Sequence, residues 1–65
     1  MVFTINKLSN SVFELTGTSK AEQQVLIDCG HDKMKYQASD MLMVLEPLAF
    51  YVNNELHEEC LFEIN

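Results

Sequence analysis

The 65-residue sequence contains no arginine and no tryptophan, and only four lysines stand against ten acidic side chains. Proteins bind nucleic acid mainly by neutralising phosphates with lysine and arginine, and arginine makes the commonest base-specific contact. The formal charge of -6 therefore argues against direct binding to nucleic acid or to an anionic membrane surface. An acidic balance can instead steer a protein toward basic surfaces.

Long apolar runs and cysteines are scarce as well. The longest apolar run, residues 41–45, is far shorter than the roughly 20 residues that span a bilayer. Residues 1–8 have no basic cluster ahead of a long apolar segment, which a secretory signal would need. Two cysteines are too few for a secreted disulfide framework. We therefore expect a cytoplasmic protein.

The amino-terminal part of the chain has the pattern of a β-hairpin. Residues 2–8 and 12–16 alternate apolar with polar side chains, and three turn-forming residues, 9–11, separate them. Side chains two positions apart on a strand share a face of the sheet. The residues that we expect on the buried face are Phe3, Ile5, Phe13 and Leu15.

Residues 18–29 allow two interpretations. The four residues that begin at Ser19 match the capping box with which many helices start. Residues 25–27, however, are a β-favouring run that precedes a cluster of turn formers. We favour a second hairpin, with residues 33–38 as its return strand, and retain a short helix over residues 20–24 as the alternative.

The strongest periodic signal predicts a helix that begins near residue 41. Five apolar side chains recur at spacings of three or four residues and so lie on one helical stripe. They are Met41, Leu45, Leu48, Val52 and Leu56. Pro47 interrupts the stripe because it lacks an amide hydrogen and its ring crowds the preceding turn. Either one helix is kinked near residue 46 or a helix begins at Pro47, and we favour the kinked helix.

Residues 60–64 alternate again and predict a closing strand. Together the elements predict one α+β domain over residues 1–65. It consists of a small antiparallel sheet, made of two hairpins and the C-terminal strand, with one long, Pro-kinked amphipathic helix packed on a face. So small a core rarely supplies more than roughly 3–5 kcal/mol, so additional support from a metal or a partner has to be considered.

The two cysteines and two histidines form the most suggestive metal-binding pattern. Cys29 and His31 are two residues apart, and His57 and Cys60 are three apart. Such a set can satisfy tetrahedral zinc, but the first spacing is outside the usual zinc-finger range. We expect thiols in the core, histidines on the surface, and neither a metal nor a cofactor. No motif of a nucleophilic enzyme accompanies these residues, so we expect no enzymatic activity.

Carboxylates gather at the C-terminal end of the predicted helix. Glu55, Glu58 and Glu59 lie where anions destabilise a helix by roughly 0.3–1 kcal/mol each. They form either a solvated face or a recognition patch for a basic partner, and Glu63 would extend that patch across the closing strand.

The helix also has more apolar side chains than one face requires. Met43, Phe50 and Tyr51 lie off the main stripe. They belong either to the protein's own core or to an interface, because methionine and aromatic residues provide contact area with little charge to desolvate.

In size, acidity and lack of catalytic signatures the chain resembles the small inhibitors that phages encode against host machinery, including anti-CRISPR proteins and nucleic-acid mimics. The resemblance rests on general properties, so it assigns no site residue. It implies a non-enzymatic protein-binding module in the host cytoplasm that blocks a basic nucleic-acid-binding or assembly surface of a larger partner. The alternative is a structural or homodimeric accessory subunit that uses an apolar helix face. A small zinc-stabilised domain is the third hypothesis.

Overall fold

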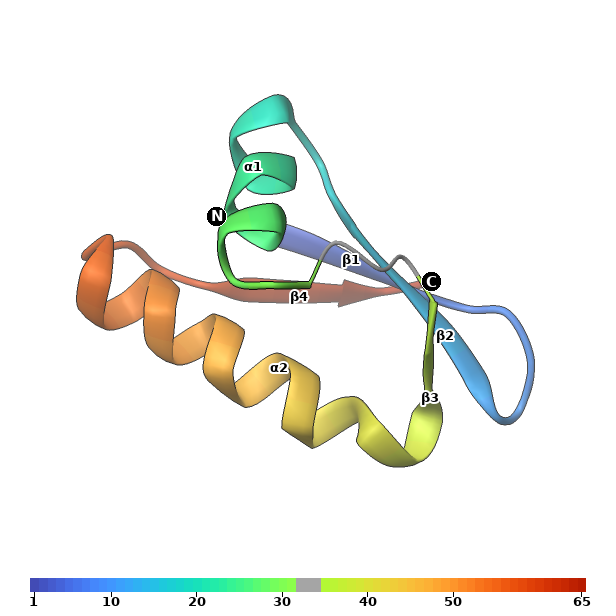
Figure 1. Ribbon diagram of the computed structural model, residues 1–65. Helices are drawn as coiled ribbons and strands as arrows, with labels where there is room; N and C mark the ends of the chain where they lie inside the picture. The colour runs from blue at the N-terminus through green and yellow to red at the C-terminus, as the bar shows by residue number, and fades with distance from the viewer. Residues whose placement is uncertain (32–34) are drawn as a thin grey trace.

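The computed structural model describes residues 1–31 and 35–65, which form a four-stranded sheet and two helices (Figure 1). The strands are β1 (Val2–Lys7), β2 (Val12–Gly17), β3 (Lys35–Gln37) and β4 (Leu61–Ile64). The first helix is α1 (Lys20–Asp28). The second is an 18-residue helix that comprises a 3₁₀ turn, η1 (Ala38–Asp40), then α2 (Met41–Phe50) and a π-helical end, η2 (Tyr51–Glu55).

The predicted first hairpin is confirmed. β1 and β2 are antiparallel, with Ile5 opposite Leu15 and Thr4 opposite Thr16. The four side chains expected on one face are no more than 2% exposed and form the centre of the core. Alternation of apolar and polar residues was sufficient to predict this pair, because the two strands are close together in the sequence and form one hairpin.

The predicted second hairpin is wrong, because residues 20–28 form α1. Ser19 caps this helix: its hydroxyl accepts a hydrogen bond from the Glu22 amide at 3.5 Å and donates one to the Glu22 carboxylate. The same carboxylate also accepts the Val2 amide of β1 at 3.0 Å. The apolar run that favoured a strand instead buries Val25 and Leu26 in the core. The capping box prevailed because its glutamate is used twice, by the helix and by the sheet.

The expected return strand is present as β3, but it pairs with β2. Tyr36 lies opposite Phe13, and the two rings stack with their centroids 5.6 Å apart. Lys35 is exposed. Lys33 and Met34, which we also placed on this strand, lie outside the described residues.

The long helix follows the predicted stripe. Leu48 and Val52 are fully buried, and Val44 joins them in the core. The helix runs through Pro47, which is exposed, so the alternative of a helix that begins at Pro47 is excluded. It ends at Glu55, earlier than expected. The chain then turns at His57, whose φ of 55° is left-handed.

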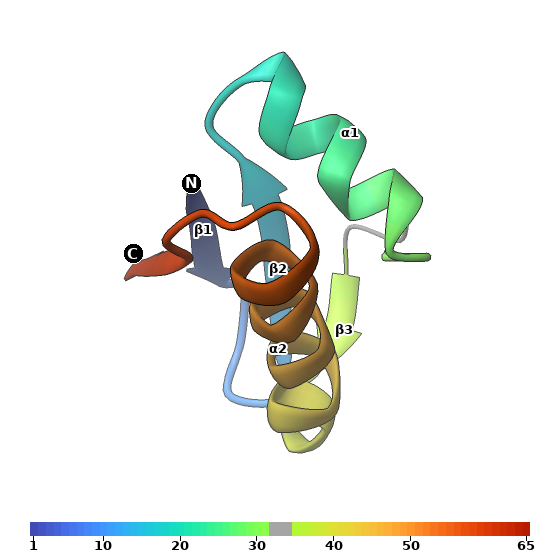
Figure 2. The same cartoon turned by 90° about the vertical axis from the view of Figure 1, so that its left-hand side faces the viewer.

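The closing strand is confirmed as β4, but the sheet is mixed and not antiparallel. β4 runs parallel to β1, with Phe62 beside Phe3, and the strand order is β3-β2-β1-β4. The reason is the direction of the long helix, which returns across the sheet to the end where β1 begins (Figure 2). A strand that starts at that end has to run in the same direction as β1.

Both helices cover the same face of the sheet (Figure 2). The opposite face carries half-exposed side chains such as Thr4, Glu14 and Thr16, and no described helix packs on it. The protein is therefore a two-layer structure with one core, between helices and sheet.

Candidate functional site

The net charge is confined to the C-terminal half of the chain. Residues 36–65 contain six acidic side chains and neither lysine nor arginine, whereas residues 1–35 contain four of each sign. The long helix, β4 and the loop that joins them therefore carry the entire formal charge of -6. This segregation is a property of the whole sequence, which a single cluster of neighbouring carboxylates does not reveal.

Three of the predicted carboxylates form an exposed group that we call the acidic patch: Glu55, Glu58 and Glu59. Glu55 ends the helix, but the other two lie in the loop before β4 and not on the helix as expected. Backbone hydrogen bonds hold this loop in place. The Glu58 amide donates to the Val52 carbonyl at 3.1 Å, and the Met1 nitrogen donates to the Glu59 carbonyl.

Glu63 lies further along β4, where it is exposed opposite Thr4 of β1. It belongs to the open face of the sheet, because Phe62 and Phe3 face the helices and neighbouring side chains alternate. Glu63, the predicted extension of the acidic patch, thus lies on β4, the strand that follows the loop of Glu58 and Glu59.

The predicted apolar interface residues divide into two kinds. Met43 and Phe50 are 75% and 65% exposed, and because seven residues separate them they lie on one side of the helix. Leu42, 70% exposed, lies beside them and was missed by the sequence analysis. Tyr51 is half-buried and packs against the core. We call Leu42, Met43 and Phe50 the outer helix face.

A second exposed apolar group lies on β4. Leu61 is 49% exposed and Ile64 is 74% exposed, although Ile64 is aligned with the buried Ile5 of β1. Phe62, between them, is half-buried and contacts Phe3 with ring centroids 6.1 Å apart. Alternation along β4 does not reveal the exposure of Ile64, because it does not show that β4 is an edge strand.

The four candidate metal ligands are not gathered into one site. Cys29 and Cys60 are half-buried against the core, and burial raises the pKa of each thiol. His57 is exposed, as expected, but His31 is half-buried and meets the Tyr36 ring edge-on. In the part of the chain that the structure describes, no three His, Cys, Asp or Glu side chains are grouped to hold a metal ion.

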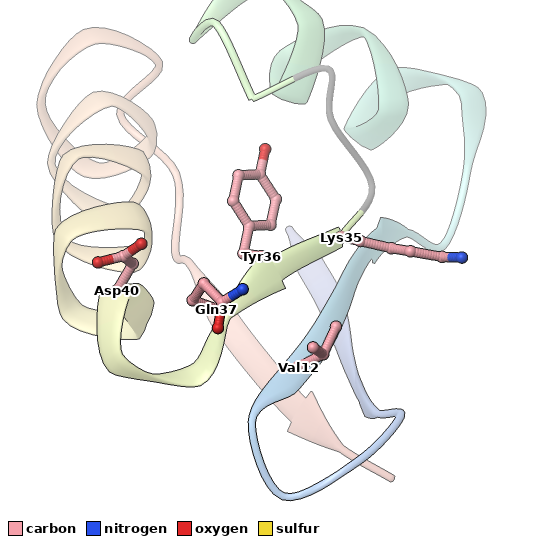
Figure 3. A pocket seen from close by; sticks show the side chains of 5 residues that line it. All are labelled: Val12, Lys35, Tyr36, Gln37 and Asp40. Atoms are coloured by element: carbon pink, nitrogen blue, oxygen red, sulfur yellow. The ribbon is translucent and has the colours of Figure 1, made fainter.

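An open hollow of about 410 Å³ lies beside β3 (Figure 3). Its lining residues are Val12, Lys35, Tyr36, Gln37 and Asp40. The Lys35 ammonium points away from Asp40, and the Tyr36 ring extends to the side of the strand that faces the helices. The polar groups that line the hollow do not converge on a common point.

Among residues 1–31 and 35–65, no helix combines the length and apolar character that crossing a bilayer requires. The chain matches no protein-family model, and comparisons with curated proteins and with solved structures find no match.

Proposed function

We propose that this protein is a non-enzymatic binding module whose acidic C-terminal half docks on a basic surface of a larger protein. The observation that supports this proposal is the confinement of all net charge to residues 36–65, next to apolar side chains that the fold leaves exposed. The finer proposal is a phage-type inhibitor, of the anti-CRISPR or nucleic-acid-mimic kind. Its partner would then use the same basic surface to bind nucleic acid or to assemble.

Charge and apolar area have different roles in such an interface. Carboxylates accelerate the encounter with a basic surface through long-range attraction, which salt screens. Exposed methionine and phenylalanine then supply area that desolvates easily, as in the centres of many interfaces. The acidic patch lies at the C-terminal end of the helix that carries the outer helix face, so one partner surface could contact both.

The test compares the protein with a variant in which Glu55, Glu58 and Glu59 are all replaced by Gln. Partners are captured from the cells of origin, and the retained partner is titrated against each variant over a range of salt concentrations. We expect the triple variant to bind more weakly at low salt and to show a flatter salt dependence, because the interaction is screened. Glu14→Gln, on the open face of the sheet, is the matched control and should bind as the wild type does.

If the partner uses the same surface to bind nucleic acid, duplex DNA should compete with this protein for binding to the partner. Unchanged binding of the triple variant at low salt would contradict the proposed role of the patch.

The second candidate function is a homodimeric accessory subunit, which the exposure of Leu42, Met43 and Phe50 favours. Light scattering distinguishes the two candidates. A dimer mass that Phe50→Ser converts to a monomer mass would support self-association through the outer helix face.

A further inference from the structure

β4 is an outer strand of the sheet, and one of its two edges is unpaired in the described chain. In a parallel ladder, alternate residues direct their backbone groups to the neighbouring strand. The Leu61 and Asn65 amides donate to the Met1 and Ile5 carbonyls of the β1 side, each at 2.9 Å. The amides and carbonyls of Phe62 and Ile64 therefore point outward. Figure 2 shows no described segment beyond β4 on that side.

This edge lacks most of the features that prevent strand addition. Edge strands are usually protected by shortness, by charged side chains, lysine above all, by proline, by a bulge or by a covering segment. β4 is four residues long and carries Glu63, but it has no lysine or proline and pairs with β1 in an unbroken register from Val2–Leu61 to Ile5–Ile64. The opposite edge strand, β3, is three residues long and carries Lys35.

We propose that β4 binds its partner by strand addition, with an extended basic segment of the partner protein as the added strand. This inference rests on the proposed function and specifies how the partner is held. Backbone hydrogen bonds to Phe62 and Ile64 supply the affinity, and the side chains on the two faces of β4 supply the selectivity.

The charges of this chain argue for a basic occupant and against a second copy of it. Two β4 strands that pair antiparallel through both outward residues match Phe62 with Ile64 of the other copy. This register places Glu63 directly opposite Glu63 of the other copy, and like charges at that position are destabilising. Each copy also carries a formal charge of -6. A lysine or arginine opposite Glu63 converts the same contact into an attraction.

The two faces of β4 define the side chains that suit the added strand. Glu63 is on the open face, whereas Ile64 faces the helix side with 74% of its surface exposed. A strand with basic residues on the open face and apolar residues beside Ile64 complements both. We therefore expect basic and apolar residues to alternate along the added strand.

The probe is a short labelled peptide in which lysine and valine alternate, and its binding to the 65-residue protein is measured by fluorescence anisotropy. Ile64→Pro removes an outward amide while leaving the amides that face β1 in place, so it blocks the edge selectively. Ile64→Thr is the matched control, because it keeps the amide and the β-branched shape. We expect Ile64→Pro to weaken binding about tenfold or more, and Ile64→Thr, which loses only part of the apolar contact, to weaken it by less. Glu63→Lys should weaken binding as well.

Two further measurements keep the result independent of any loss of fold in Ile64→Pro. A peptide methylated on alternate backbone nitrogens cannot donate to β4 along that edge and should bind weakly to the wild type. In the complex with the unmodified peptide, the Phe62 and Ile64 amides should exchange with solvent more slowly than in the free protein.

Any one of three results would overturn strand addition. The lysine–valine peptide fails to bind, or its glutamate–valine counterpart binds equally well. The third is that amide exchange at Phe62 and Ile64 is unchanged in the complex. None of these outcomes affects the test of the acidic patch, which uses the captured partner and the glutamine variants. The proposed function can therefore survive the failure of this inference.

Discussion

At the residue scale, Gly17 and Glu22 determine how α1 meets the sheet. A Cβ atom at Gly17 would lie 2.6 Å from the Glu22 Cβ and 2.7 Å from the Gln23 backbone nitrogen. The last residue of β2 therefore has no room for a side chain under the first turn of the helix. The close approach lets the Glu22 carboxylate reach the Val2 amide at 3.0 Å, which joins α1 to β1.

Gly17→Ala is expected to destabilise the fold by about 1–3 kcal/mol, because the methyl group meets backbone atoms that cannot move aside without shifting α1. Chemical denaturation measures the loss. Gly30→Asn is the control: Gly30 has a φ of 80° and open space around it, and asparagine tolerates this left-handed conformation. An equal loss in both variants would mean that the cost comes from losing glycine and not from the contact with α1.

Glu22 makes the fold sensitive to acid. The Ser19 hydroxyl, followed by the Val2 amide, holds the pKa of Glu22 below its ordinary value. A carboxylate with a lowered pKa in the folded state contributes stability above its unfolded pKa and loses it as the pH falls through the folded pKa. The free energy of unfolding should therefore decline as the pH falls below the unfolded value of about 4.3.

Glu22→Gln should be less stable than the wild type at neutral pH and should show a shallower decline over the same range, because glutamine does not titrate. Denaturant titrations at a series of pH values measure both effects. The control is Glu46→Gln, which changes an exposed carboxylate on α2 and should leave the slope nearly unchanged. A slope that is identical in wild type and Glu22→Gln would show that other carboxyl groups cause the acid sensitivity.

At the scale of the elements, the long helix has two faces with different roles. Its inner face packs Val44, Leu48 and Val52 into the core, and its outer face exposes Leu42, Met43 and Phe50. Pro47 lies in the middle of α2, where its missing amide removes one hydrogen-bond donor. The buried face holds the helix on the sheet despite this loss, because burial of apolar area dominates helix stability in folded proteins.

Leu48→Ala should cost roughly 2–5 kcal/mol, which is comparable to the whole stability of so small a domain. Leu48 is fully buried, so truncation leaves a cavity that the surrounding core cannot fill. Leu42→Ala is the matched control on the same helix and should change stability by less than about 0.5 kcal/mol. Thermal unfolding of both variants checks the difference. An unchanged transition in Leu48→Ala would contradict the assignment of the inner face to the core.

At the scale of the whole molecule, charge and topology coincide. The crossover from β3 through the long helix, together with β4, lies within residues 36–65, and these residues carry all of the net negative charge. Half of the protein is therefore electrically neutral overall, and the other half repels copies of itself and attracts basic surfaces. The same crossover places β4 at the edge of the sheet, so the strand available for pairing belongs to the charged half.

The local elements were largely determined by the sequence. Alternation of apolar and polar residues was sufficient to predict the first hairpin and β4. The spacing of Leu45, Leu48 and Val52 was sufficient to predict the long helix. Sequence also singled out the carboxylates of the acidic patch and the exposed Met43 and Phe50. These patterns are readable because each depends on residues close together in the chain.

The tertiary structure decided what depends on distant residues. Residues 20–28 became a helix because Glu22 found a partner in β1, twenty positions away, and because Gly17 let the helix approach. β4 became a parallel edge strand because the long helix returned the chain to the start of β1. Ile64 is exposed because it lies on this edge strand. Local propensity carries no information about which strand becomes the neighbour, since register and strand order are set by burial and chain direction across the whole molecule.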